Sequence, residues 1–225
     1  MKDLKENLFE LRDADYRDFH AKLMPTVEKE RIIGIRTPVL RSFAKKYFKT
    51  ADSCIFLDSL PHYYYEENNL HAMCIGFTSD FETQLDLIEK FLPYVDNWAT
   101  CDTLAPKSFK AHPEAVLEKV REWIKSEHVY TVRFALVVLM QFFLDDNYTP
   151  EILELAISAK NTDYYIMMAK AWFMSFALIK QYDKALPCLT ERRLDRMTHN
   201  KSIQKALESY RIDENTKKFL RTLKY

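Results

Sequence analysis

A tryptophan and a carboxylate stand four residues apart near the middle of the 225-residue sequence, in Asp96-Asn97-Trp98-Ala99-Thr100-Cys101-Asp102. On a helix, this spacing places both side chains on one face, where they can meet the same ligand. Arg133, within an apolar run, and Trp172, in another segment of helical character, are candidates to join them. A carboxylate, two indoles and a guanidinium from three helices would suit a cationic or charge-developing substrate.

Each of these residues also has a structural explanation. A lone tryptophan in a helical protein usually belongs to the core, and we assign Trp123 there because no similar group surrounds it. Asp102 has the alternative of capping a following helix. Arg133 lies among Val132, Phe134 and other apolar residues, so its guanidinium must find a partner or face a groove. A structural ion pair is the alternative reading of Arg133.

The helices that must position these residues are predicted mainly by the scarcity of glycine, since only Gly34 and Gly76 occur and sheets with hairpins usually need more. The pattern predicts an all-α protein. One or two amphipathic helices are expected in residues 1–24, and Thr37-Pro38 is expected to cap and open the next. The expected helices then cover 39–48, 51–60, 65–77, 81–95, 114–124, 129–143, 151–159, 163–181 and 201–210.

Helices of this length joined by short polar links predict antiparallel pairs stacked as a HEAT-like helical-repeat solenoid, an alpha-alpha superhelix. We expect one such domain over residues 1–225. The sequence has no clean period, so a compact helical bundle is the competing architecture. A solenoid would bring Trp98, Asp102, Arg133 and Trp172 to its concave surface.

Charge is divided along the chain, although 33 basic and 33 acidic residues give a formal net charge of zero. Residues 28–50 carry seven bases and two acids, whereas residues 51–100 carry nine acids and one base. From residue 184 onwards, eleven bases stand against five acids. This asymmetry fits a polyanion-binding face opposite an acidic face, and solvated helix faces are the plainer alternative.

The composition also bears on location, disulfide bonds and metal binding. No apolar stretch reaches the length of a membrane span, and the first residues lack the apolar core of a signal peptide, so we expect a cytoplasmic protein without a membrane partner. The four cysteines are widely spaced and are expected to be free thiols. His71 and Cys74 have a metal-ligand interval but no second pair, so we expect no metal and no other cofactor.

Four segments together resemble the bacterial DNA alkylation repair enzymes of the AlkD type. They are Gly34-Ile35-Arg36-Thr37-Pro38-Val39-Leu40-Arg41, Asn97-Trp98-Ala99-Thr100-Cys101-Asp102, Val132-Arg133-Phe134-Ala135 and Tyr164-Tyr165-Ile166-Met167-Met168-Ala169-Lys170-Ala171-Trp172. The resemblance runs from about residue 30 to about residue 210, in order and with compatible spacing. A single one of these segments is weak evidence for the family, whereas all four in this order are fairly specific for it.

The resemblance implies a HEAT-like solenoid that acts in base-excision repair as an alkylpurine DNA glycosylase, a hydrolase of N-glycosyl bonds. Its substrates would be positively charged purines, such as 3-methyladenine and 7-methylguanine, in double-stranded DNA. Carried over by motif, Asp102 is similar to the catalytic carboxylate, Trp98 and Trp172 to the aromatic walls, and Arg133 to the phosphate-contacting guanidinium. We further expect a monomer whose DNA-backbone contacts come from Arg36, Arg41, Lys45 and Lys170.

One segment departs from the family pattern. Active members carry an aromatic residue shortly before the Gly-x-x-Thr-Pro segment, where this chain has Leu23-Met24-Pro25. The rival hypothesis is therefore a non-catalytic HEAT-like module that binds nucleic acid or protein in the same groove. A third is a protein-interaction solenoid that uses the cluster Tyr63 to Tyr65.

Overall fold

The computed structural model describes residues 3–160 and 163–225, and all regular secondary structure within these ranges is helical. The prediction of an all-α protein is confirmed. Residues 1 and 2 of the first expected helix lie outside the described residues. Two compact units are present, with their boundary in the sequence between Ser108 and Phe109. A single domain over residues 1–225 stays a prediction.

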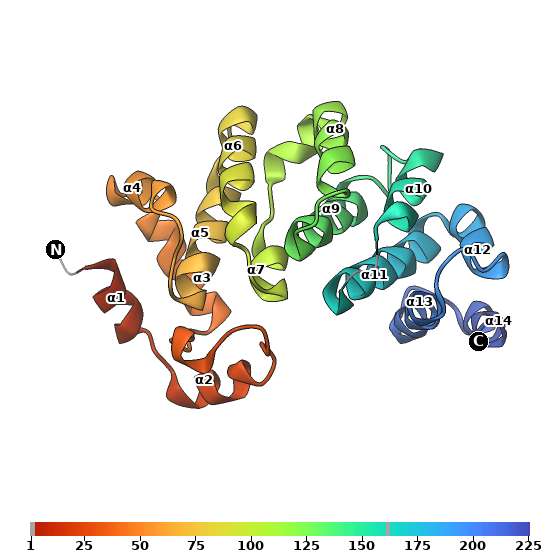
Figure 1. Ribbon diagram of the computed structural model, residues 1–225, viewed down its shortest axis with the longest axis horizontal. Coiled ribbons are helices and arrows are strands. Elements are labelled where there is room, and N and C mark those ends of the chain that lie inside the picture. The colour runs from red at the N-terminus through yellow and green to blue at the C-terminus, as the bar shows by residue number, and fades with distance from the viewer. Residues whose placement is uncertain (1–2, 161–162) are drawn as a thin grey trace. The chain divides into compact units, whose positions relative to one another are not determined.

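The first unit is organised around one central helix, α5, ten of whose 13 residues are buried. Helices α3, α4, α6 and α7 all pack against α5 (Figure 1). The α-helices of this unit are α1 (Leu4–Glu10), α2 (Ala14–Ala21), α3 (Thr37–Tyr47), α4 (Asp52–Asp58), α5 (Tyr65–Phe77), α6 (Phe81–Phe91) and α7 (Trp98–Thr103). Short 3-10 turns follow α2 at Lys29–Arg31 and α6 at Leu92–Tyr94.

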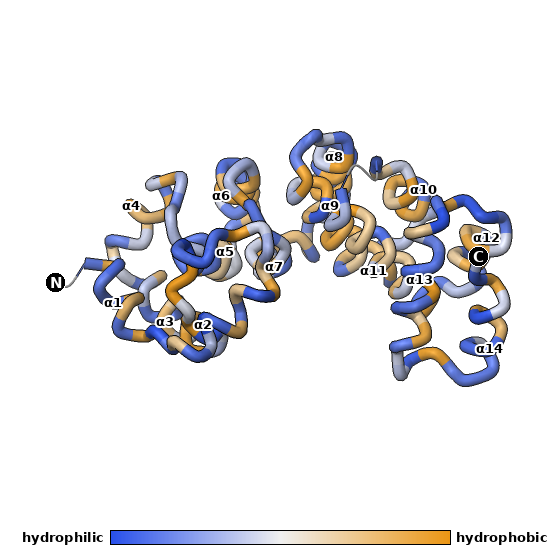
Figure 2. The backbone as a smooth tube through the Cα atoms, turned by 60° about the horizontal axis from the view of Figure 1, so that its bottom comes forward, coloured by the Kyte–Doolittle hydropathy of each residue, from blue (hydrophilic) through white to orange (hydrophobic). Residues whose placement is uncertain are grey.

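In the second unit, consecutive helices form two alternating rows. Its α-helices are α8 (Pro113–Trp123), α9 (Val129–Phe142), α10 (Pro150–Ser158), α11 (Tyr164–Lys180), α12 (Tyr182–Thr190), α13 (Arg196–Glu208) and α14 (Glu214–Thr222), preceded by a 3-10 turn at Lys107–Ala111. Helix α11 packs against both α9 and α13, while α8, α10, α12 and α14 flank this row. Figure 2 shows hydrophobic residues along α9 and α11. Stacking on the nearest neighbours is the packing of a helical-repeat solenoid.

Proline and capping residues explain where the helices begin and end. The helix expected over 81–95 ends at Phe91, and Pro93 stands in the 3-10 turn that follows. Pro38 occupies the first turn of α3, as expected, and Pro113 and Pro150 occupy the first turns of α8 and α10, because proline there forfeits no helical hydrogen bond. Thr37 is itself the first residue of α3, so its expected role as the N-cap is corrected by one position.

Three helices, α7, α12 and α14, lie outside the predicted ranges, and α13 begins earlier than expected. Helix α12 contains Pro187 in its interior, which is a signal against a helix. Helix α13 begins at Arg196 rather than at residue 201, because the Asp195 side chain accepts a hydrogen bond from the Thr198 backbone N–H at 3.0 Å. Asp213 caps α14 in the same way.

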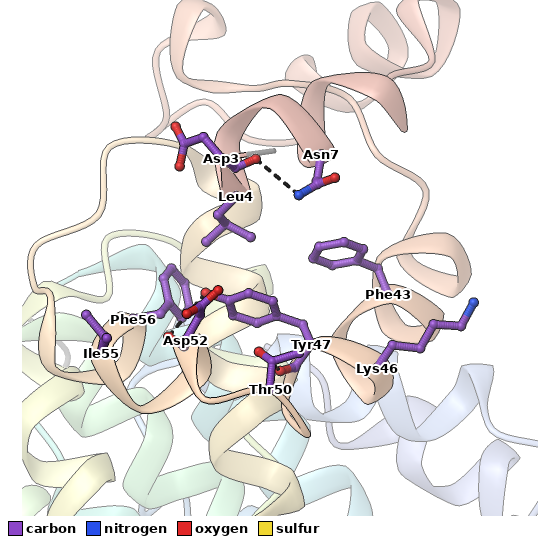
Figure 3. A pocket seen from close by; sticks show the side chains of 10 residues that line it. All are labelled: Asp3, Leu4, Asn7, Phe43, Lys46, Tyr47, Thr50, Asp52, Ile55 and Phe56. Atoms are coloured by element: carbon purple, nitrogen blue, oxygen red, sulfur yellow. Dashed lines mark hydrogen bonds between the residues drawn. The ribbon is translucent and has the colours of Figure 1, made fainter. Parts of the chain in front are cut away.

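A hollow of about 680 Å³ lies between α1, α3 and α4 of the first unit. Figure 3 shows Phe43, Tyr47 and Phe56 lining it, with Asn7 of α1 and Asp3, which precedes α1, on the opposite side. None of the candidate residues lines this hollow. Among the described helices, none is both long enough and apolar enough to cross a membrane.

Candidate functional site

Trp98 and Asp102 lie on one face of α7, which confirms their expected helical placement. The helix begins after Asn97, whose side-chain oxygen accepts a hydrogen bond from the Thr100 backbone N–H at 2.8 Å. Thr100 and Cys101 face the interior and are fully buried. Trp98 and Asp102 are half-buried, so this short helix presents an indole and a carboxylate on its outer side.

The Trp98 ring is fixed at two points. It packs against the buried cluster of Met24, Val27, Ile32 and Tyr65. In addition, its indole N–H donates a hydrogen bond to the backbone carbonyl oxygen of Leu23 at 3.2 Å. The segment in which the sequence departs from the family pattern therefore lies directly beside Trp98.

Asp102 lies in the last turn of α7, and the next helical turn begins only at Lys107. The alternative in which Asp102 caps a following helix is therefore wrong. Its catalytic role stays a prediction.

Arg133 is buried in α9, with 6% of its surface exposed. Its guanidinium donates a hydrogen bond to the Tyr165 carbonyl oxygen in the first turn of α11 at 3.1 Å. This contact links two neighbouring helices of the second unit. Contact between Arg133 and a phosphate stays a prediction.

Trp172 is half-buried on α11, where its ring meets Phe176 edge to face with centroids 6.1 Å apart. Both rings line a hollow of about 310 Å³, together with Lys205 of α13 and Arg211 beyond it. The Arg211 guanidinium lies over the Phe176 ring at 5.8 Å from its centroid. Trp123, by contrast, is a core residue with 6% of its surface exposed, as predicted.

The basic residues expected at the DNA backbone differ in exposure. Arg36, Arg41 and Lys45 are exposed on or beside α3. The Arg36 guanidinium donates a hydrogen bond to the Asp13 carboxylate at 2.8 Å. Lys170 is buried, and its ammonium group donates hydrogen bonds to the carbonyl oxygens of Ile157 and Ala159 at the end of α10. A phosphate contact would require Lys170 to leave these carbonyl groups.

Sequence reasoning missed the residue that holds the segment before α3. The fully buried Glu66 carboxylate accepts hydrogen bonds from three consecutive backbone N–H groups, those of Ile33, Gly34 and Ile35, at 2.8, 2.7 and 3.2 Å. Burial raises the pKa of Glu66, and the three N–H groups oppose that rise. The sequence did not predict this contact, because residues 33–35 lie more than 30 positions before Glu66. Within the segment, only Gly34 stood out, as one of two glycines in the chain.

Gly34 is required where it stands. Its φ angle is 94°, which favours glycine, and a Cβ atom there would lie 2.5 Å from the Arg17 Cβ and 2.7 Å from the Asp13 carbonyl oxygen. The close approach also allows the Asp13 backbone N–H to donate to the Gly34 carbonyl oxygen at 2.8 Å. Glycine and the buried carboxylate together fix the backbone that leads to Arg36.

The chain was also compared with known protein families. A family model described as DNA alkylation repair enzyme matches residues 2–210, a span that contains all the site residues predicted from the sequence. A search of the curated proteins found no match.

Proposed function

Because the chain belongs to the family of DNA alkylation repair enzymes, we propose that it hydrolyses the N-glycosidic bond of positively charged alkylated purines in duplex DNA. The proposed substrates are 3-methyladenine and 7-methylguanine, and the reaction would begin base-excision repair. The placement of Trp98 and Asp102 on the outer face of α7 supports this proposal best.

The reaction requires mainly a negative charge near the sugar and a correctly placed water molecule. An alkylated purine leaves with the bonding electrons and thereby loses its positive charge, while positive charge develops on the sugar. The Asp102 carboxylate would stabilise that charge and orient a water molecule, whose oxygen bonds to the sugar carbon and whose proton passes to the carboxylate or to solvent. The Trp98 ring would add cation–π attraction.

We propose roles for two residues of the second unit as well. Trp172, half-buried beside its hollow, would form a second aromatic wall, and Arg133 would contact a phosphate. Arg36, Arg41 and Lys45 offer exposed charges for the DNA backbone. Since such contacts release counterions, binding to duplex DNA would weaken as salt is raised.

The test compares Asp102→Asn with the parent protein on methylated duplex DNA. The variant keeps the shape and removes the charge, so single-turnover release of 7-methylguanine should fall by about a hundredfold or more. DNA affinity should hold or rise because a negative charge has been removed. Asp86→Asn is the matched control, since Asp86 is exposed on α6 and pairs only locally with Lys90, at 2.8 Å. Equal release by parent and Asp102→Asn would remove Asp102 from the mechanism.

A non-catalytic DNA-binding module is the second candidate, and the departure beside Trp98 favours it. Leu23 is 47% exposed, and its backbone carbonyl oxygen contacts the indole, in the segment where the resemblance leads us to expect an aromatic residue. Salt-sensitive DNA binding without any release of methylated purines by the parent protein would establish this module instead.

A further inference from the structure

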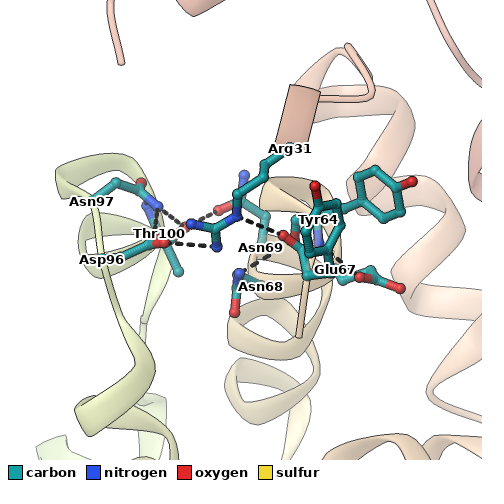
Figure 4. Close-up of polar contacts among 9 residues, drawn as sticks. Arg31, Tyr64, Glu67, Asn68, Asn69, Asp96, Asn97 and Thr100 are labelled. Atoms are coloured by element: carbon teal, nitrogen blue, oxygen red, sulfur yellow. Dashed lines mark hydrogen bonds and ion pairs between the residues drawn. The ribbon is translucent and has the colours of Figure 1, made fainter. Parts of the chain in front are cut away.

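A buried polar network holds the inner face of α7 (Figure 4). The Asn97 amide donates to Asp96 Oδ1 at 2.8 Å and to the Thr100 hydroxyl at 2.9 Å. The Thr100 hydroxyl in turn donates to Asn69 Oδ1 of α5 at 2.8 Å. Asn97, Thr100 and Asn69 expose at most 5% of their surfaces, so water offers little replacement for these bonds.

Helix α5 is also held to α2. Tyr65 lies one turn before Asn69 on α5, and its hydroxyl faces α2. That hydroxyl lies 3.0 Å from His20 Nε2 on α2. On the other side, Asp96 forms an ion pair with Arg31 at 2.9 Å. Polar side chains thus tie α7 to α5 and, through Asp96, to the 3-10 turn that ends at Arg31, while another such contact ties α5 to α2.

Helix α7 depends on such anchors because it has only six residues. Isolated helices shorter than about 12 residues are marginal in water, so tertiary contacts must supply the stability of α7. Thr100 lies on the inner side of the helix, opposite Trp98 and Asp102. Any shift of Thr100 therefore moves both outer side chains together.

We propose that Asn69 and Thr100 are positioning residues for the reaction, because the hydrogen bond between them sets the place of Trp98 and Asp102. This inference rests on the proposed function for its catalytic consequence. Its structural part, the dependence of α7 on this bond, stands apart from any activity. A misplacement of about 1 Å can cost an enzyme up to a hundredfold in rate, so a single buried bond is enough to affect the reaction.

The test uses three threonine variants on one helix. Thr100→Val preserves the shape and removes the hydroxyl, and it leaves Asn69 Oδ1 without its donor. Thr100→Ser keeps the hydroxyl. Thr103→Val is the matched control, because the Thr103 hydroxyl donates to the Ala99 carbonyl oxygen of its own helix at 2.8 Å.

Single-turnover release of 7-methylguanine should fall about tenfold in Thr100→Val, with DNA affinity unchanged. Thr100→Ser and Thr103→Val should stay close to the parent rate. Asn69→Ala should also slow release. The double variant Asn69→Ala/Thr100→Val should be no slower than Thr100→Val, because Thr100→Val already breaks the bond to Asn69 and, in addition, removes the acceptor of the Asn97 amide. A parent rate in Thr100→Val, or a loss in Thr103→Val equal to that in Thr100→Val, would overturn the proposal.

Amide hydrogen exchange separates this inference from the proposed function. Backbone amides in residues 97–104 should exchange faster in Thr100→Val than in the parent, Thr100→Ser or Thr103→Val. If the parent releases no purine, the proposed function fails while this comparison still decides whether the bond places α7. Unchanged exchange in Thr100→Val would refute the structural part.

Discussion

Replacing Glu66 with glutamine should destabilise the protein more than any surface acid-to-amide change. The carboxylate uses Oε2 for the Ile33 N–H and Oε1 for those of Gly34 and Ile35. Glutamine has one acceptor oxygen, and its NH₂ group would face a backbone donor. At least one buried N–H group then loses its acceptor, and the remaining bonds lose their charge assistance.

The magnitude follows from these losses. An unsatisfied buried N–H group costs about 1 to 3 kcal/mol. Charge-assisted hydrogen bonds are roughly twice as strong as neutral ones, so the two retained bonds weaken as well. The free energy of unfolding should therefore fall by about 2 to 4 kcal/mol for Glu66→Gln. For a chain of this size, that corresponds to a melting temperature lower by roughly 10 °C.

Urea denaturation followed by circular dichroism measures this change, with Asp86→Asn as the control. Because Asp86 and Lys90 form an exposed pair one turn apart, the control should lose no more than about 0.5 kcal/mol. If Glu66→Gln unfolds at the same urea concentration as the parent, the three N–H groups do not depend on this carboxylate. The explanation given for the segment before α3 would then be refuted.

Three further predictions concern DNA binding and pH. Arg41→Ala should reduce the salt dependence of duplex binding by about one phosphate contact, measured by fluorescence anisotropy, and an unchanged slope would remove Arg41 from the interface. Arg133→Ala should weaken DNA binding by about 1 to 3 kcal/mol, with partial rescue by Arg133→Lys, whereas lower thermal stability with intact binding would favour a purely structural role. The third concerns His62 and His71, which lie 2.8 Å apart between Nε2 and Nδ1, and burial lowers their pKa values to about 4 and about 3. Stability against urea should therefore be full above about pH 6.5 and fall below it, because the unfolded chain takes up protons first, and equal stability at pH 7 and pH 5 would contradict these pKa values.

Local patterns predicted most of the helices and the face of α7. Scarce glycine, proline in first turns and apolar periodicity each depend on a few neighbouring residues. They can therefore be recognised from the sequence alone. Helix α12 was missed because Pro187 normally breaks a helix, and neighbouring packing on α11 outweighs that preference. The spacing of Trp98 and Asp102 was informative for the same local reason.

Contacts between distant segments could not be predicted in this way. Glu66 reads as one more acid in an acidic stretch, yet its partners lie more than 30 residues earlier. Lys170 reads as a free base in a site motif, whereas its partners are carbonyl groups at the end of α10. Thr100 carried no signal, because its importance depends on Asn69 being opposite it in space. Charge and motif identify candidate residues, but burial decides how each is used.

The bond between the Trp98 indole and Leu23 has a consequence for how this site tolerates sequence drift. The acceptor is a main-chain carbonyl oxygen, which every amino acid supplies. The side chain at position 23 can therefore be substituted while the Trp98 N–H group keeps its hydrogen-bond acceptor. A change from leucine to an aromatic residue at position 23 would therefore leave the acceptor of the Trp98 N–H group in place.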